Sequence, residues 1–416
     1  MNTQRRSRKQ HLVAAVSLCA LTSVGCGFCR SPVDDPNSNL PGSCTGQQPL
    51  IEPQKLDILF VIDNSGSMVP NQEGVARELV AFVDEVRKGG GVSQDFHIGV
   101  ITTSVYQHAR VKGVDGFVYY PDQSGKLRAV PDLAPDGGVL LGTGTERMLN
   151  GDDPDLIAKF SRLVRQGTGG SGQETPFEAI RLAVASDLAT TPLDQGGNGG
   201  FLRDGARLLI VMLSDSDDCS ETDRPPKVWV SNDMTVDDCA NQATSLTTVS
   251  DYFDILMGLK DGNGAQRDVI YAAIAPVGLT SKQTQAVLEG GRLHCIDCPT
   301  AEGTGVRHRQ MAEMWDSTLT NLDSICRASY RETLVTIAGL ANVSQSLEVS
   351  NVPDEQMLVL DIIRKDGTRQ TCTMSNGGLS TYDKPIDGRP GRIHFAGDCR
   401  RRADDSEVVI RMLCAG

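Results

Sequence analysis

The chain has 416 residues, of which 39% are hydrophobic and 5% aromatic, so it is long enough to bury a sizeable, mainly aliphatic core in more than one domain. Its formal net charge is −13. No basic cluster follows the first few residues, so the charge argues against nucleic acid as a partner and against electrostatic binding to an anionic lipid surface.

The first 25 residues predict an export signal. Four basic residues lie between Arg5 and Lys9, and the apolar run over residues 12–24 is shorter than the ~20 residues of a membrane span. Gly25 and Cys26 resemble a bacterial lipobox, which implies that Cys26 becomes the lipidated first residue of the mature chain. Ser23 stands where that motif usually has an aliphatic residue, so plain secretion is the alternative.

Residues 26–54 are rich in Ser, Pro, Gly, Asn and Gln, which predicts a tether. Within it, Cys29 and Cys44 are spaced to close a small bridged loop.

Cysteine usage predicts disulfides. Of 12 cysteines, Cys19 leaves with the signal and Cys26 carries the lipid, so ten remain, an even number that suits five bridges in an oxidising compartment. The pair expected first is Cys219 with Cys239. The full set of candidates is Cys29, Cys44, Cys219, Cys239, Cys295, Cys298, Cys326, Cys372, Cys399 and Cys414.

Cys295 and Cys298 form a Cys-x-x-Cys pair. In an exported chain we expect disulfide pairing, one of the two with Cys326. The alternative is a zinc site, for which His308 and Cys326 are the nearby additional ligands.

Residues 55–62 are near-continuously apolar, as expected for a central strand of a parallel sheet with helices on both faces. Asp63, Ser65 and Ser67 follow directly and offer one carboxylate and two hydroxyls at alternating positions. Oxygen ligands alone select a hard cation such as Mg²⁺, Mn²⁺ or Ca²⁺. The alternative is that Asp63 and Ser65 only cap the next helix.

Two distant stretches offer further oxygen atoms. Thr175 lies in a Gly-rich loop before Pro176, where its alternative role is a helix N-cap. Asp215 ends a second buried-strand run that begins at Arg207. In an open α/β sheet both strand ends face the same crevice, so we expect Asp63 and Asp215 to lie close together.

These three stretches resemble the von Willebrand factor A (VWA) family over residues 55–343. The resemblance implies a metal-ion-dependent adhesion site made of Asp63, Ser65, Ser67, Thr175 and Asp215, with Mg²⁺ (or Mn²⁺ or Ca²⁺) as the ion. It further implies that the hydroxyls contact the ion directly, that the two aspartates act largely through water, and that an Asp or Glu of a partner protein completes the coordination shell.

Further apolar patterns predict the other elements of this domain. Helices are expected from residue 70 to about 88 and over residues 155–164, 177–188, 252–259 and 330–340, and strands over residues 96–104, 269–277 and 322–325. The fold class is therefore α/β, with a doubly wound, mostly parallel sheet. Residues 106–151 are expected to be an insertion at the ligand side.

Residues 344–416 contain short β-like runs separated by Pro, Gly and Asp, which predicts a small antiparallel β-domain. Cys372, Cys399 and Cys414 are an odd number, which implies one bridge towards the main domain. A β-tail after an exported A-type domain is similar to myxobacterial-like surface lipoproteins of predatory and soil bacteria.

The acidic run over residues 217–223 is expected to be a solvated loop, with a second Ca²⁺ site as the alternative. We expect no enzyme, because no His motif places a base beside an activated water. The function expected is metal-dependent protein binding or adhesion at the cell envelope, by an outer-membrane lipoprotein. A structural envelope protein and a metal-dependent hydrolase are the alternatives.

Overall fold

The computed structural model describes residues 49–111, 114–119, 131–132, 141–142, 147–228, 239, 242–289, 292–352, 358–374, 379–386, 389–402 and 404–412. The predicted signal, the lipidation site Cys26, and Cys29, Cys44 and Cys414 lie outside these residues, so what was predicted for them stays a prediction. Within the described ranges, no helix is long and apolar enough to cross a membrane.

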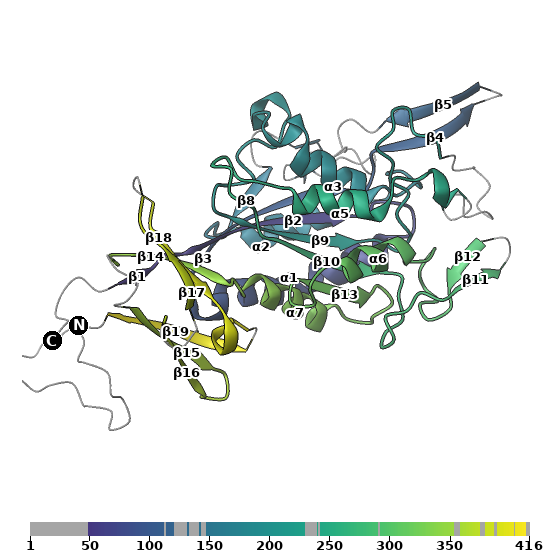
Figure 1. Ribbon diagram of the computed structural model, residues 1–416. Helices are drawn as coiled ribbons and strands as arrows, with labels where there is room; N and C mark the ends of the chain where they lie inside the picture. Colours follow the sequence, from purple (N-terminus) through teal and green to yellow (C-terminus); the bar gives the residue numbers. More distant parts are fainter. Residues whose placement is uncertain are drawn as a thin grey trace, which may run out of the picture. The chain divides into compact units, whose positions relative to one another are not determined.

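A six-stranded sheet lies at the centre of the described chain (Figure 1). Its strand order is β13 (Thr320–Ser324), β10 (Val269–Ala275), β9 (Arg207–Leu213), β2 (Gln54–Ile62), β3 (Gln94–Thr102) and β8 (Met148–Asn150). The first five strands are parallel, and β8 pairs antiparallel with β3 at the edge. The predicted α/β class with a mostly parallel sheet is confirmed.

Helices cover both faces of this sheet because its central strands are apolar on both sides. In β2, Ile58 and Phe60 pack into one hydrophobic cluster, and Leu59 and Val61 pack into the other. The first cluster includes residues of α1 (Val69–Lys88), α2 (Leu156–Val164) and α7 (Arg331–Ala341). The second includes residues of α3 (Pro176–Ala185), α5 (Val249–Met257) and α6 (Val306–Met314).

The connections between these elements carry small hairpins and short 3-10 helices. The antiparallel pairs are β4 (Tyr106–Val111) with β5 (Val114–Tyr119), β6 (Pro131–Asp132) with β7 (Leu141–Gly142), and β11 (Ala286–Glu289) with β12 (Arg292–Cys295). The 3-10 helices are η1 (Gly89–Gly91), η2 (Asp187–Ala189), η3 (Leu193–Gln195), η4 (Ala243–Ser245) and η6 (Gly397–Cys399). The stretch predicted as an insertion thus ends in β8, a strand of the main sheet.

The C-terminal part forms two antiparallel sheets, as its β-like runs predicted. One has the order β1 (Leu50–Ile51), β14 (Ser346–Ser350), β18 (Gly391–Phe395) and β17 (Leu379–Asp383). The other has the order β16 (Arg369–Cys372), β15 (Leu358–Arg364) and β19 (Asp405–Met412). Strand β1 lies within residues 26–54, the stretch predicted as a tether. There, Leu50 and Ile51 pair with β14. The predicted domain boundaries themselves remain predictions.

Among the described residues, disulfides join Cys219 to Cys239, Cys298 to Cys326 and Cys372 to Cys399. The two pairings expected for Cys219 and Cys326 are confirmed. The prediction that every remaining cysteine is paired is wrong at Cys295, which keeps a free thiol. Cys295 is 1% exposed and belongs to the hydrophobic core, where a thiol behaves as a small apolar side chain. Since Cys298 and Cys326 bond to each other, they are not available for the alternative zinc site.

Cys295 should therefore resist alkylation in the folded protein and react only after unfolding. We expect iodoacetamide, added without reductant, to modify Cys295 in urea but not in native buffer, because burial denies the reagent access. Peptide mass spectrometry gives the readout, with the Cys298–Cys326 peptide as an internal control that stays disulfide-linked in both conditions. A disulfide bond formed by Cys295 itself, with Cys298 or Cys326 left alkylated, would contradict this assignment.

Candidate functional site

The parallel pairing of β2 and β9 places the first and last predicted site residues together. Ile62 lies beside Leu213, so Asp63 and Ser214 leave neighbouring strands at the same level of the sheet. The Asp63 amide donates to the Leu213 carbonyl at 2.9 Å, and the Ser214 hydroxyl donates to Asp63 Oδ2 at 2.6 Å. Asp63 Oδ1 accepts the Ser65 amide at 2.8 Å. The Asp63 carboxylate is thus held at both oxygens and has no exposed surface.

The two serine hydroxyls converge in the loop after Asp63. Ser65 Oγ and Ser67 Oγ are 3.5 Å apart. Residue Met68 occupies the N-cap position of α1, and no side chain caps that helix. The alternative in which Asp63 and Ser65 serve as caps is therefore wrong, and both side chains remain with the site.

The Gly-rich loop reaches the Asp63 loop through a close contact that needs glycine. A Cβ atom on Gly170 would lie 2.2 Å from Asn64 Oδ1, a distance at which atoms overlap. The Gly170 amide donates to the Asn64 carbonyl at 3.0 Å, and the Ser104 hydroxyl donates to Asn64 Oδ1 at 2.7 Å. These bonds fix the loop that carries Thr175 against the loop that carries the serines.

Thr175 is fully buried beside the end of β3. Its hydroxyl donates to the Thr103 carbonyl at 2.8 Å and makes no capping bond to α3. The first-turn amides of α3 are satisfied instead by other side chains: Phe177 N donates to Asp218 Oδ1 and Glu178 N donates to Ser220 Oγ. The capping alternative is therefore wrong for the Thr175 side chain, whose oxygen lone pairs are left for another ligand.

Asp215 is 2% exposed, and its Oδ1 has no hydrogen-bond partner among the described residues. The Ser67 hydroxyl lies within hydrogen-bonding reach of this carboxyl. Burial, and after it the charge of Asp63, raise the pKa of Asp215 to about 7. Burial also raises the pKa of Asp63. Both carboxyl groups are buried at the ends of their strands.

A third buried carboxyl, Glu174, belongs to this site and was not predicted from the sequence. It is 5% exposed, lies within hydrogen-bonding reach of the Ser65 hydroxyl, and has its pKa raised well above the ordinary range by burial and by the Asp63 charge. Its position directly before Thr175 was the one available signal.

The donor set of this site suits a hard divalent cation. Across the described chain, no Lys or Arg forms an ion pair with Asp63, Glu174 or Asp215. Buried carboxylates without a counter-charge are costly unless a proton or a cation neutralises them. No three His, Cys, Asp or Glu side chains within the described ranges are close enough to hold an ion by themselves. An ion here would therefore depend on the hydroxyl oxygens as well.

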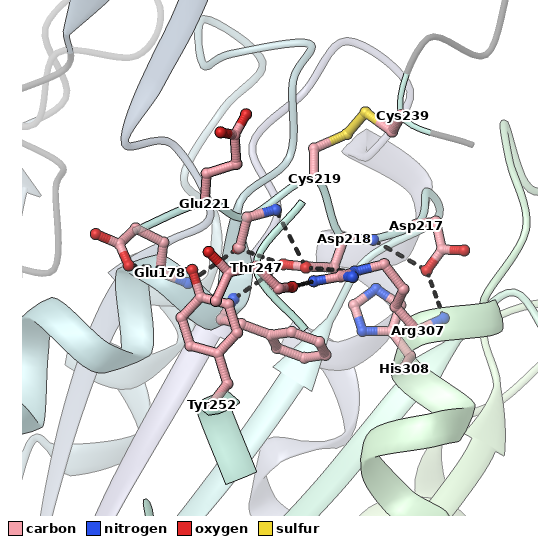
Figure 2. A network of polar contacts seen from close by, with 12 residues as sticks. Glu178, Asp217, Asp218, Cys219, Glu221, Cys239, Thr247, Tyr252, Arg307 and His308 are labelled. Carbon is pink, nitrogen blue, oxygen red and sulfur yellow. Dashed lines mark hydrogen bonds and ion pairs between the residues drawn. A yellow bond between two sulfur atoms is a disulfide. The ribbon is translucent and has the colours of Figure 1, made fainter. Parts of the chain in front are cut away.

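The acidic run after Asp215 is neither a solvated loop nor a second cation site, contrary to both interpretations of the sequence. Figure 2 shows Asp217 and Asp218 within the network of polar contacts, beside Arg307. Asp217 accepts the Val306 and Arg307 amides at 2.9 Å each, at the first turn of α6. Asp218 is fully buried and accepts Arg307 Nε at 2.9 Å. Glu221 accepts the Lys227 amide, and Asp223 is exposed.

His308 is a core histidine. Its Nε2 lies 3.1 Å from the Ser216 carbonyl, and its ring packs edge-on against Phe177 (Figure 2 shows it beside Arg307). Burial lowers its pKa to about 4, so the ring is neutral near pH 7.

Comparison with known proteins found no matching family model and no matching curated protein. Among solved structures, the chain is similar to proximal thread matrix protein 1 of the mussel byssus, at 13% identity and a TM-score of 0.32, over 74% of this chain and 51% of that chain. It therefore spans about half the length of the mussel protein.

It is also similar to the manganese-loaded TRAP protein of Plasmodium vivax, at 11% identity and a TM-score of 0.32, over 88% of this chain and 94% of that chain. The human COPII-coat protein Sec24c matches at 9% identity and a TM-score of 0.28, over 86% and 39% of the two chains. Such low TM-scores say nothing about the site.

The Arg307–Asp218 pair should contribute strongly to stability because it is buried. We expect Arg307→Met to lower the free energy of unfolding by about 3–5 kcal/mol, since it leaves a buried carboxylate without its counter-charge. Arg309→Met, two residues on in α6, removes an arginine whose partner Glu313 is 55% exposed, and should change the free energy by less than about 1 kcal/mol. Urea unfolding compares the two. Equal changes in the free energy of unfolding would show that the buried pair stabilises the fold no more than the exposed one.

Proposed function

We propose that Asp63, Ser65, Ser67, Thr175 and Asp215 form a VWA-type metal-ion-dependent adhesion site, and that the protein binds a partner protein through it. The ion proposed is Mg²⁺, with Mn²⁺ or Ca²⁺ as alternatives. The observation that carries the proposal is the convergence of three distant stretches at one edge of the sheet, around a pair of hydroxyls and an Asp215 oxygen that has no partner among the described residues.

Each residue has a separate role in this proposal. Ser65, Ser67 and Thr175 offer hydroxyl oxygens, and the bond from Thr175 to Thr103 orients its lone pairs. Asp63 and Asp215 supply negative charge, and Asp63 is fixed by Ser214. A divalent cation with neutral direct ligands stays electrophilic, so it would attract an Asp or Glu carboxylate of the partner.

A binding role is proposed rather than catalysis. His308 lies near Asp63, but it is buried, neutral near pH 7 and bound at Nε2 to the Ser216 carbonyl, so it is not placed to act as a general base. The proposed location is the cell envelope, through export and lipidation at Cys26, and this part rests on the sequence alone.

Removing one carboxylate should abolish the effect of the ion on stability. We expect Mg²⁺ at a hundredfold excess over its dissociation constant to stabilise the wild type by about 2.7 kcal/mol, seen as a rise in melting temperature. Asp63→Asn and Asp215→Asn keep the side-chain shape and remove the charge, so both should lose this rise. The same variants should lose Mg²⁺-dependent, EDTA-sensitive capture of protein from an envelope extract.

Asp223→Asn is the matched control, because Asp223 belongs to the same acidic run but is exposed. It should keep the full Mg²⁺ shift. Retention of the wild-type shift in both site variants would show that the ion binds elsewhere, and the proposed site would be wrong.

A further inference from the structure

Gln72, near the start of α1, connects the two loops that carry the proposed site. Its side chain is 2% exposed. Its Nε2 donates to the Asp63 carbonyl at 2.8 Å and to the Gly167 carbonyl at 3.0 Å, and its Oε1 accepts the Gly167 amide at 3.1 Å. A glutamine side chain has two N–H donors and one carbonyl oxygen, so each of its polar atoms is engaged with these two loops.

Gly167 begins the stretch of chain that leads to Thr175. Its φ of 74° lies in the left-handed region, which glycine adopts readily. Just before it, Arg165 forms an ion pair with Glu73 at 2.7 Å, but the two side chains are 38% and 44% exposed, so that pair contributes little. The start of the stretch is therefore held mainly by its buried hydrogen bonds to Gln72.

The bonds of Gln72 act on the backbone of a proposed site residue. They hold the carbonyl of Asp63, whose carboxylate is bound by Ser214. One residue on, the Asn64 carbonyl accepts the Gly170 amide at 3.0 Å. These bonds set the spacing between the loop of Asp63 and the loop of Thr175. Since Mg²⁺ requires near-ideal octahedral geometry at about 2.0–2.1 Å, a small change in this spacing should alter its affinity.

We propose that Gln72 is a positioning residue of the metal-ion-dependent adhesion site: it fixes the two loops at the spacing that Mg²⁺ needs. This inference rests on the proposed function. Gln72 stays outside the coordination shell of the ion, because its amide nitrogen and oxygen are both bound to backbone groups.

The test is calorimetric titration of the full chain with Mg²⁺. Gln72→Met keeps the length of the side chain and removes its hydrogen bonds to both loops. Mg²⁺ should then bind about 10- to 100-fold more weakly, the usual cost of losing a group that orients metal ligands from outside the coordination shell. A purely structural role would lower the melting temperature of the metal-free protein and leave the Mg²⁺ affinity of the folded protein unchanged, and that result would overturn the inference.

Asn71→Leu is the matched control. Asn71 precedes Gln72 in α1 and also uses its side-chain amide, but its Nδ2 donates to the Tyr330 hydroxyl at 2.9 Å, away from both loops. This variant should keep the wild-type Mg²⁺ affinity. An equal loss of affinity in the two variants would show a general disturbance of α1 and would count against a special role for Gln72.

A second measurement needs no ion. Without Mg²⁺, the backbone amide of Gly167 should exchange its hydrogen faster in Gln72→Met than in the wild type, because its acceptor is gone. Asn71→Leu should leave this exchange rate unchanged. Exchange in Gln72→Met at the wild-type rate would show that Gln72 does not hold the loop, which would overturn the inference.

Asp63→Asn separates this inference from the proposed function. Loss of Mg²⁺ binding in Asp63→Asn with wild-type affinity in Gln72→Met would leave the site standing and remove only the role of Gln72. Wild-type protein that binds no Mg²⁺ would remove both. Circular dichroism checks folding. Should Gln72→Met not fold, Gln72→Asn keeps the amide on a side chain too short to reach both loops; it should still weaken Mg²⁺ binding, and an unchanged affinity there would refute the positioning role.

Discussion

The parallel register of β2 with β9 is the constraint on which the candidate site depends. It sets Ile62 beside Leu213, so the chain leaves both strands at one level and the Ser214 hydroxyl reaches the Asp63 carboxylate. A shift of one residue would turn every side chain of β2 to the opposite face and break both hydrophobic clusters. The packing of two helical layers therefore enforces a register that also positions the polar groups beyond the strand ends.

Beyond those strand ends, the buried acids fall into two groups with different chemistry. Asp217, Asp218 and Glu221 accept backbone amides, and Asp218 also binds Arg307, so their charges are compensated within the chain. Asp217 meets the first turn of α6, and Asp218 that of α3, where helix amides favour a negative charge. Among the described residues, Asp63, Glu174 and Asp215 form no ion pair with Lys or Arg, although Asp63 accepts the Ser65 amide and the Ser214 hydroxyl. The compensated group holds two helices in place, and the other group lies where we propose that a cation binds.

The sequence predicted those elements whose signal is local. The runs that form β2, β9 and β10 are apolar throughout because helices cover both faces of the sheet. Such a run is recognisable in the sequence without knowing which helices pack against it. Helix α6 was missed, since most of its residues are polar and its buried face is limited to His308, Met311 and Ala312. The inward folding of Asp217 and Asp218 was also missed. Their hydrogen-bond donors lie on α3 and α6. The sequence of an acidic run does not indicate which distant backbone amides its carboxylates will bind.

Glu174 shows why a site can be recognised before it is complete. Thr175 fits the motif by which the site was predicted. The burial of Glu174 depends instead on the bond from the Cys219 amide to its carbonyl and on the end of β3, and both contacts exist only in the folded chain. Natural sequences depart from ordinary local preferences mainly where function requires it, and a buried carboxylate without a counter-charge is such a departure. The compensated acids nearby show that this chain can neutralise buried charge by its own means. Glu174 has no such partner among the described residues, which separates it from the network of acids that fixes α3 and α6.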